Sequence, residues 1–156
     1  MGKTRLAIEA TEIIKERFAL HAFIPVEELT RPWLLADTIL RALSIPRDPE
    51  IEAIDLLVER LKAFRILLVL DSFEHLLVEA TPFEGDAREL LGHLLQRMPY
   101  LHCLVTSRQK LQIPGEWDLN LMPLSTPTHE ITDIAEIAAF PSVQLYLRRA
   151  QEKRAD

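Results

Sequence analysis

The sequence predicts an α/β fold in which helices cover a parallel β-sheet. Five consecutive aliphatic residues, 66–70, end in Asp71, and a second apolar run, 101–105, leads into polar residues 106–107. Strands that are apolar on both faces belong inside a parallel sheet. Segments with apolar residues at helical spacing stand before and after both runs, and this alternation of strand and helix indicates the α/β class.

The composition bounds the organisation of the protein. The chain has 156 residues, 48% of them hydrophobic, which suits one core and a single domain over residues 1–156. A net charge of -6 lacks the basic footprint of a nucleic-acid-binding surface, so we expect no direct nucleic acid contact. No apolar run approaches the length of a membrane span and no signal-peptide pattern opens the chain, so we expect no membrane contact and a cytoplasmic location. Cys103, the only cysteine, argues against a disulfide or a metal cluster.

The first half of the chain predicts three amphipathic helices and one strand before the run that ends in Asp71. The helices are expected over residues 4–18, 33–43 and 51–62. The apolar face of the first is expected to contain Leu6, Ala7, Ile8, Ile13 and Ile14. Residues 21–26 favour a short strand, and an edge position in the sheet would tolerate Pro25, which cannot donate a ladder bond.

The second half predicts shorter elements with more turns. The expected elements are a helix over 73–80, a loop over 81–85, a helix capped by Asp86 and ending near 97, a strand over 101–107, a turn at 114–116, a strand over 117–121, a few helical residues within 131–139, and a helix over 141–153. The last helix is expected to turn Val143, Leu145, Tyr146 and Leu147 toward a core.

Gly2, Lys3 and Thr4 stand directly before the first helix. They match the last three residues of the phosphate-binding loop, in which backbone N–H groups and a lysine bind phosphates and a hydroxyl binds Mg²⁺. Asp71 is the natural second magnesium group, since nucleotide-bound Mg²⁺ often takes one hydroxyl and one carboxylate from the protein. The alternative is a flexible glycine, a solvated lysine, a capping threonine and an aspartate that caps the next helix.

Two further charged residues stand close to the ends of the predicted strands. Arg108 follows the second buried strand and could bind a terminal phosphate through paired hydrogen bonds, or could be a surface arginine opposite nearby acids. Glu74 could orient a water molecule as a catalytic residue, although a glutamate that complements a helix dipole explains it equally well.

Five ordered motifs resemble the ATPase domain of signal-transduction NTPases with numerous domains. This NB-ARC-like, STAND-class P-loop module occurs in large bacterial transcriptional regulators of the LuxR and SARP types. The motifs are residues 2–7 (GKTRLA), 67–77 (LLVLDSFEHLL), 104–108 (LVTSR), 115–117 (GEW) and 140–146 (FPSVQLY). The resemblance spans nearly the whole chain.

The resemblance implies a three-layer P-loop NTPase sheet and a switch set by ATP or ADP with Mg²⁺. By this match, Gly2, Lys3 and Thr4 correspond to the end of the Walker A loop, with Arg5 next to them in the same motif. Asp71 corresponds to the Walker B acid and Arg108 to the first sensor position. The partners implied are a nucleotide and the other domains of a longer parent protein.

The sequence departs from the family pattern at both ends. The first glycines of the loop and the strand before it are absent, and so is the downstream proline motif that contacts adenine, so we expect a single partial domain whose first strand is missing. Losing two or three backbone contacts worth roughly 1.5 to 3 kcal/mol each would leave millimolar or weaker nucleotide affinity. Ser72 stands where Asn is usual and no acid follows Asp71 directly, so the intact parent is expected to be a slow ATPase at most and this fragment inactive.

Two alternatives stay open at this point. The chain could be a scaffold or a nonfunctional gene fragment that binds no nucleotide. It could also be an unrelated phosphotransferase with Asp71 as its nucleophile, although it lacks a supporting downstream lysine motif.

Overall fold

The computed structural model describes residues 2–77, 86–128, 131 and 133–152. It divides into two compact units, residues 2–118 and the residues from 119 onward, which are described separately. The prediction of one domain stays a prediction. None of the helices in the described residues is long and apolar enough to cross a membrane.

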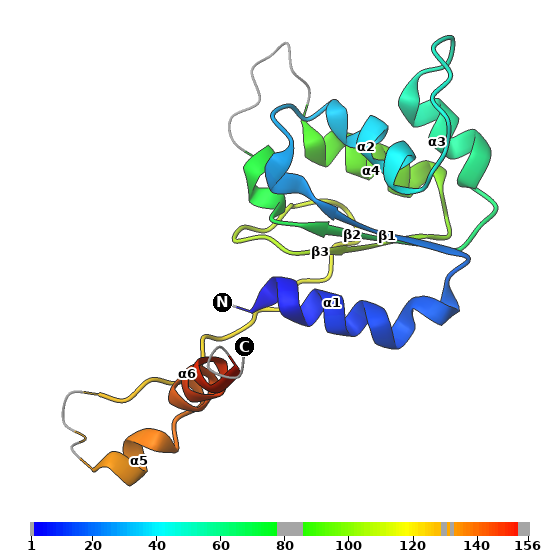
Figure 1. Ribbon diagram of the computed structural model, residues 1–156. Helices are drawn as coiled ribbons and strands as arrows, with labels where there is room; N and C mark the ends of the chain where they lie inside the picture. The colour runs from blue at the N-terminus through cyan, green and yellow to red at the C-terminus, as the bar shows by residue number, and fades with distance from the viewer. Residues whose placement is uncertain (1, 78–85, 129–130, 132, 153–156) are drawn as a thin grey trace. The chain divides into compact units, whose positions relative to one another are not determined.

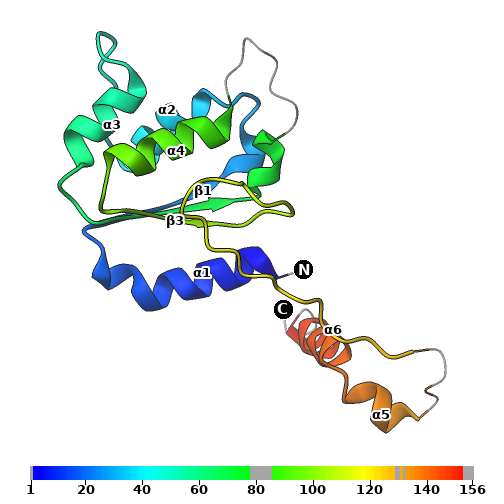
Figure 2. The same cartoon turned by 180° about the vertical axis from the view of Figure 1, so that it is seen from behind.

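Residues 2–118 form a three-layer α/β unit around a parallel sheet, as the sequence predicts. The sheet has the strand order β1-β2-β3, with β1 at Leu20–Pro25, β2 at Ile66–Asp71 and β3 at Leu101–Val105. The helices of this unit are α1 (Lys3–Ile14), α2 (Leu34–Ala42), α3 (Ala53–Leu61) and α4 (Ala87–Arg97), with short 3₁₀ turns at Lys15–Arg17, Val26–Glu28 and Phe73–Leu76. Helices α2, α3 and α4 cover one face of the sheet and α1 lies on the other (Figures 1 and 2).

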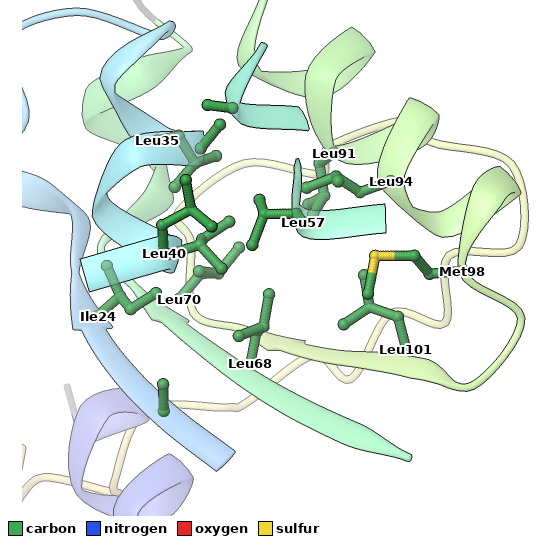
Figure 3. Close-up of a cluster of buried hydrophobic side chains, with 14 of the residues drawn as sticks. Ile24, Leu35, Leu40, Leu57, Leu68, Leu70, Leu91, Leu94, Met98 and Leu101 are labelled. Carbon is green, nitrogen blue, oxygen red and sulfur yellow. The ribbon is translucent and has the colours of Figure 1, made fainter. Parts of the chain in front are cut away.

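Strand β2 is the centre of the core because every one of its residues is buried. Side chains alternate across a strand. Ile66, Leu68 and Leu70 therefore join the large cluster under α2, α3 and α4, and Leu67 and Val69 meet α1. Figure 3 shows Leu68 and Leu70 among side chains that come from all three covering helices. The prediction of a strand buried on both faces is confirmed.

Helix α1 packs through a narrower stripe than the sequence suggests. Ala7 and Thr11 are its buried residues, and the Thr11 hydroxyl donates to the Ala7 carbonyl at 2.7 Å, so this polar group is satisfied. Leu6, Ile8 and Ile13 are exposed, which corrects the predicted apolar face. Small residues at the contact let the helix approach the sheet, and of the larger predicted residues Ile14 packs against the same cluster while partly buried.

The sheet edges differ in character. Pro25 ends β1, which has a partner on one side only among the described residues, as the sequence predicts. Strand β3 pairs with β2 and its last three residues are half-buried. Cys103 is half-buried as a residue, but its thiol is enclosed by the protein, and this burial raises the pKa of the thiol to about 12. Cys103 thus behaves as the small hydrophobic residue that its apolar neighbours indicate.

Several predicted elements are shorter than expected or absent. The helix predicted over 73–80 is a 3₁₀ turn over Phe73–Leu76, and its last residues and the loop over 81–85 lie outside the described residues. The strand predicted over 117–121 is wrong. Trp117 is 97% exposed and Leu119 is 77% exposed, and no described strand pairs with this segment. Alternation forms a strand only where one face can be buried and the backbone can be paired.

The unit from residue 119 onward contains two described helices, α5 (Ile134–Ala138) and α6 (Pro141–Glu152). Both lie within the predicted helical segments, and Asp133 caps α5 through a hydrogen bond to the Ala135 N–H at 2.9 Å. The predicted inward face of α6 is wrong for the described structure, since none of its described residues is buried and Tyr146 is 72% exposed. An amphipathic pattern identifies the apolar side of a helix, but it cannot supply the surface that covers it.

Candidate functional site

The carboxyl ends of β2 and β3 meet at one point of the sheet edge. The two strands pair in parallel with Leu70 opposite Val105, so the next residues, Asp71 and Thr106, are neighbours. The Thr106 hydroxyl donates to Asp71 Oδ1 at 2.5 Å and accepts a hydrogen bond from the Ser72 N–H at 2.9 Å. Asp71 and Thr106 are both buried. Because the Ser72 N–H occupies one lone pair of the hydroxyl, its proton is directed at the carboxylate.

The first turn of α1 reaches the same carboxylate. The Thr4 hydroxyl lies 2.8 Å from Asp71 Oδ1 and 3.0 Å from Asp71 Oδ2 and donates to this carboxylate. Gly2 caps the helix with φ 100°, a conformation that favours glycine, and an added Cβ would meet open space. The first N–H groups of a helix have no partner within the helix and carry its positive dipole end. The structure therefore joins a carboxylate, a hydroxyl and free N–H groups at one place.

The two basic residues of this motif differ in position. Lys3 is the first residue of α1 and is half-buried. Arg5 forms an ion pair with Glu9, with Nη2 and Oε1 2.6 Å apart, and their side chains are 70% and 54% exposed. Arg5 thus pairs along the surface of α1. No described contact joins Arg5 to Asp71, whereas Thr4 makes two.

Glu74 and Arg108 form an ion pair just after the ends of β2 and β3. Ser72 adopts a left-handed conformation with φ 63°, which turns the chain into the 3₁₀ segment behind β2. The Phe73 N–H then donates to the Thr106 carbonyl at 2.9 Å and Phe73 is fully buried. Glu74 Oε1 lies 3.1 Å from Arg108 Nε, and the glutamate side chain is 15% exposed while the arginine side chain is 82% exposed.

The segment after Arg108 forms a loop that the Glu116 carboxylate holds together. Both oxygens of Glu116 accept backbone hydrogen bonds, from the Leu111 N–H at 3.0 Å and from the Gln112 N–H at 2.7 Å. Gly115 and Gln112 have φ 83° and 59°, so the turn passes twice through left-handed backbone. Glu116 of the 115–117 motif thus has a structural role, since it closes the loop over residues 111–116 that follows Arg108.

A separate groove of about 680 Å³ lies between the start of α2, helix α4 and residues 112–114. Trp33, Arg88, His93 and Gln96 are among its lining residues. None of the predicted site residues lines this groove. The groove is therefore separate from the predicted site at the strand ends and the start of α1.

The donor set at Asp71 suits Mg²⁺ held together with phosphate. A hydroxyl and a carboxylate, both hard oxygen ligands, are in direct contact. Among the described residues, no group of three or more His, Cys, Asp or Glu side chains is placed to hold a metal ion by itself. The residues present fit a cation that takes its other ligands from phosphate and water, with Thr4 and Asp71 as the protein groups.

Thr106 is the site residue that the sequence did not identify. Thr106 directly follows the apolar run 101–105, just as Asp71 directly follows the apolar run 66–70. The signal available in the sequence was that each residue stands one position after the end of such a run, and the two strands were expected to be parallel neighbours. The register between the strands was needed to use that signal, because a shift of one residue would put Ser107 beside Asp71.

The chain is similar to proteins from mycobacteria. It is 31% identical over 157 residues to an uncharacterized protein of Mycobacterium tuberculosis, a match that covers 100% of this chain and 35% of the relative. It is 32% identical over 150 residues to a protein of the same species that is provisionally named an HTH-type transcriptional regulator, covering 96% of this chain and 15% of that protein. The same matches occur in Mycobacterium bovis.

These relatives are longer than the chain, which spans about a third of the first of them and less of the second. No solved structure matches the chain significantly. The NACHT domain model matches residues 1–145, which is most of the sequence. With its parallel α/β sheet and the grouped residues at the strand ends, the chain belongs to the NACHT domain family of P-loop NTPases.

Proposed function

We propose that the chain is the nucleotide-binding part of an ATP- or ADP-dependent regulatory switch in a longer transcriptional regulator. The contact between Thr4 and Asp71 carries this proposal, because it joins the start of α1 to the end of β2 at 2.8 Å. The phosphates would bind at the first turn of α1, where Lys3 neutralises charge and Gly2 leaves room for a close approach. Membership in a P-loop NTPase family and the similarity to a provisionally named regulator support the same function.

Magnesium would be held by Thr4 and Asp71 in this proposal. When bound, the ion supplies positive charge that neutralises the phosphates. Thr106 keeps Asp71 oriented through its hydrogen bond to Oδ1. Glu74 is the candidate catalytic residue if hydrolysis occurs, and Arg108 the candidate phosphate sensor. We propose a cytoplasmic protein in which this segment contacts other domains of the parent but no nucleic acid directly.

The topology also suggests where a strand in front of Gly2 would lie. Crossovers between parallel strands are right-handed. The connections from β1 to β2 and from β2 to β3 place their helices on one face, whereas α1, which leads into β1, lies on the opposite face (Figures 1 and 2). A strand in front of α1 would therefore lie beyond β3, not beyond β1. A glycine-rich loop at the end of that strand would lead into Gly2 beside Asp71 and Thr106.

Nucleotide titration tests the proposed function. In a chain extended upstream of Gly2 by a strand and a glycine-rich loop, we expect MgATP and MgADP to bind. Lys3→Ala and Asp71→Ala should each weaken binding by at least about tenfold, the effect of losing one charge-assisted contact. Lys62→Ala is the matched control, because Lys62 is an exposed lysine at the end of α3.

The result against the proposal is equally direct. Calorimetry that detects no nucleotide binding to the extended chain, or binding that Lys3→Ala and Asp71→Ala leave unchanged, would favour the scaffold alternative. The 156-residue chain alone should bind nucleotide in the millimolar range or more weakly, since it lacks the contacts of a glycine-rich loop.

A further inference from the structure

The two side chains of the Glu74–Arg108 ion pair differ greatly in solvent exposure. This difference suggests that Arg108 can exchange Glu74 for another anion. Arg108 Nε lies 3.1 Å from Glu74 Oε1, but the arginine side chain is 82% exposed and the glutamate side chain only 15% exposed. Glu74 is fixed between Phe73 and Leu76, both buried. An ion pair with one solvated partner is weak, because solvent screens it and the long arginine side chain loses freedom in it. The solvated Arg108 side chain can therefore swing away, whereas the buried Glu74 side chain cannot follow.

The second oxygen of Glu74 reinforces this asymmetry. Glu74 Oε2 is buried and has no hydrogen-bond partner among the residues that the structure describes. Buried carboxylate oxygens normally have donors, so this oxygen makes Glu74 an under-satisfied anion. The cation that the structure pairs with this anion is Arg108.

Arg108 is also close in sequence to the phosphate side of the site. Thr106, two residues earlier, donates directly to Asp71, and Asp71 accepts a hydrogen bond from Thr4 at the start of α1. A terminal phosphate bound there would offer the guanidinium two oxygens in a planar fork and more negative charge than one carboxylate. Glu74 and the phosphate would then compete for the same arginine.

We infer that Glu74 is a specificity-determining competitor that holds Arg108 until a triphosphate displaces it. The inference rests on the proposed function and deepens it. The terminal phosphate of a triphosphate binds Arg108 in place of Glu74. A diphosphate lacks this phosphate, so Arg108 stays paired with Glu74. The pair therefore sets the preference of the site for ATP over ADP.

The test measures MgATP and MgADP dissociation constants by calorimetry in the upstream-extended chain. Glu74→Gln keeps the shape of the side chain and removes its charge, so it should tighten MgATP binding by about two- to fivefold, the strength of an exposed ion pair. MgADP binding should stay within about twofold. Arg108→Ala should weaken MgATP by about tenfold or more and leave MgADP unchanged.

The double variant separates competition from a structural effect. If Glu74 acts only by holding Arg108, Glu74→Gln should have no effect on MgATP binding in the Arg108→Ala background. The control pair is Arg97 and Asp55, whose Nη1 and Oδ1 are 2.6 Å apart on the exposed surface of the same unit. Asp55→Asn and Arg97→Ala should leave both nucleotides unaffected.

Two failures are distinguishable. If Lys3→Ala and Asp71→Ala abolish binding but Glu74→Gln leaves the ATP to ADP ratio unchanged, the exchange is wrong and the proposed function stands. If no form of the extended chain binds nucleotide, the proposed function fails and the exchange fails with it. Arg108 is exposed, so its variants keep the test decisive even if Glu74→Gln unfolds the chain.

Discussion

The Thr4 hydroxyl donates to the carboxylate of Asp71 from 2.8 Å, across 67 positions of sequence. This bond ties the first turn of α1 to the end of β2, and the positive end of the helix faces the same carboxylate. Thr4 and Asp71, the two proposed magnesium ligands, thus also join two elements of the fold. Substitutions at this site should change stability as well as binding.

Removal of the Thr4 hydroxyl should have a measurable cost that depends on Asp71. We expect Thr4→Val to lower the free energy of unfolding by about 1 kcal/mol, the value of an ordinary hydrogen bond and less than that of one to a charged group, because Thr4 is exposed. The same change in an Asp71→Ala background should cost almost nothing. Urea denaturation followed by circular dichroism gives the free energies of unfolding for this double-mutant cycle. Thr4→Ser is the control, because it keeps the hydroxyl. Equal costs in both backgrounds would show that the bond does not contribute.

Thr106 should be more sensitive than Thr4. Thr106→Val leaves the Ser72 N–H without its acceptor and removes one of the two hydroxyls that donate to Asp71 Oδ1, so we expect a loss of about 2 to 3 kcal/mol. Thr106→Ser should recover most of it. Thr126→Val, at an exposed threonine, should stay within about 0.5 kcal/mol in the same denaturation experiment. A Thr106→Val variant as stable as the parent would mean that water replaces the hydroxyl.

Ser72 offers a stabilising substitution. Its φ of 63° is left-handed, where a side chain is strained and glycine is not. Ser72→Gly should therefore raise the free energy of unfolding by about 0.5 to 1 kcal/mol, while the β-branched Ser72→Val should lower it. Ser125→Gly is the control, because Ser125 is not among the described residues with positive φ. Glycine there relieves no strain and only increases the conformational freedom of the unfolded chain. Thermal unfolding of the three variants would decide, and a destabilised Ser72→Gly would contradict the strain.

Cys103 should be unreactive in the folded chain and should make stability fall at high pH. Burial raises the pKa of its thiol from 9.0 to about 12. The protonated thiol favours the folded state, so its contribution is complete below pH 9 and is lost as pH rises toward 12. Native chain should react with a disulfide reagent about a thousandfold more slowly than unfolded chain, since only the thiolate reacts. Cys103→Ala should show a weaker loss of stability over this pH range, and fast labelling of native chain would refute the burial.

The sequence by itself determined the class of the fold and most of its elements. The run 66–70 is apolar on both faces, so only a central position in a helix-covered sheet could bury it, and the structure confirms this. Asp86 as a helix cap was equally predictable, because capping depends on residues next to each other in the chain, and its carboxylate accepts from the Arg88 N–H at 2.8 Å. Strong local patterns of this kind need no knowledge of distant partners.

Only the tertiary structure decided which of the suspected residues meet. The register of β2 against β3 puts Thr106 beside Asp71, and the packing of α1 adds Thr4 but leaves Arg5 on the surface with Glu9. The prediction of a strand over 117–121 is wrong for the same reason, because no strand among the described residues pairs with this segment. Periodicity records which side of an element is apolar, whereas contacts between elements depend on register and on covering surfaces that lie far away in the sequence.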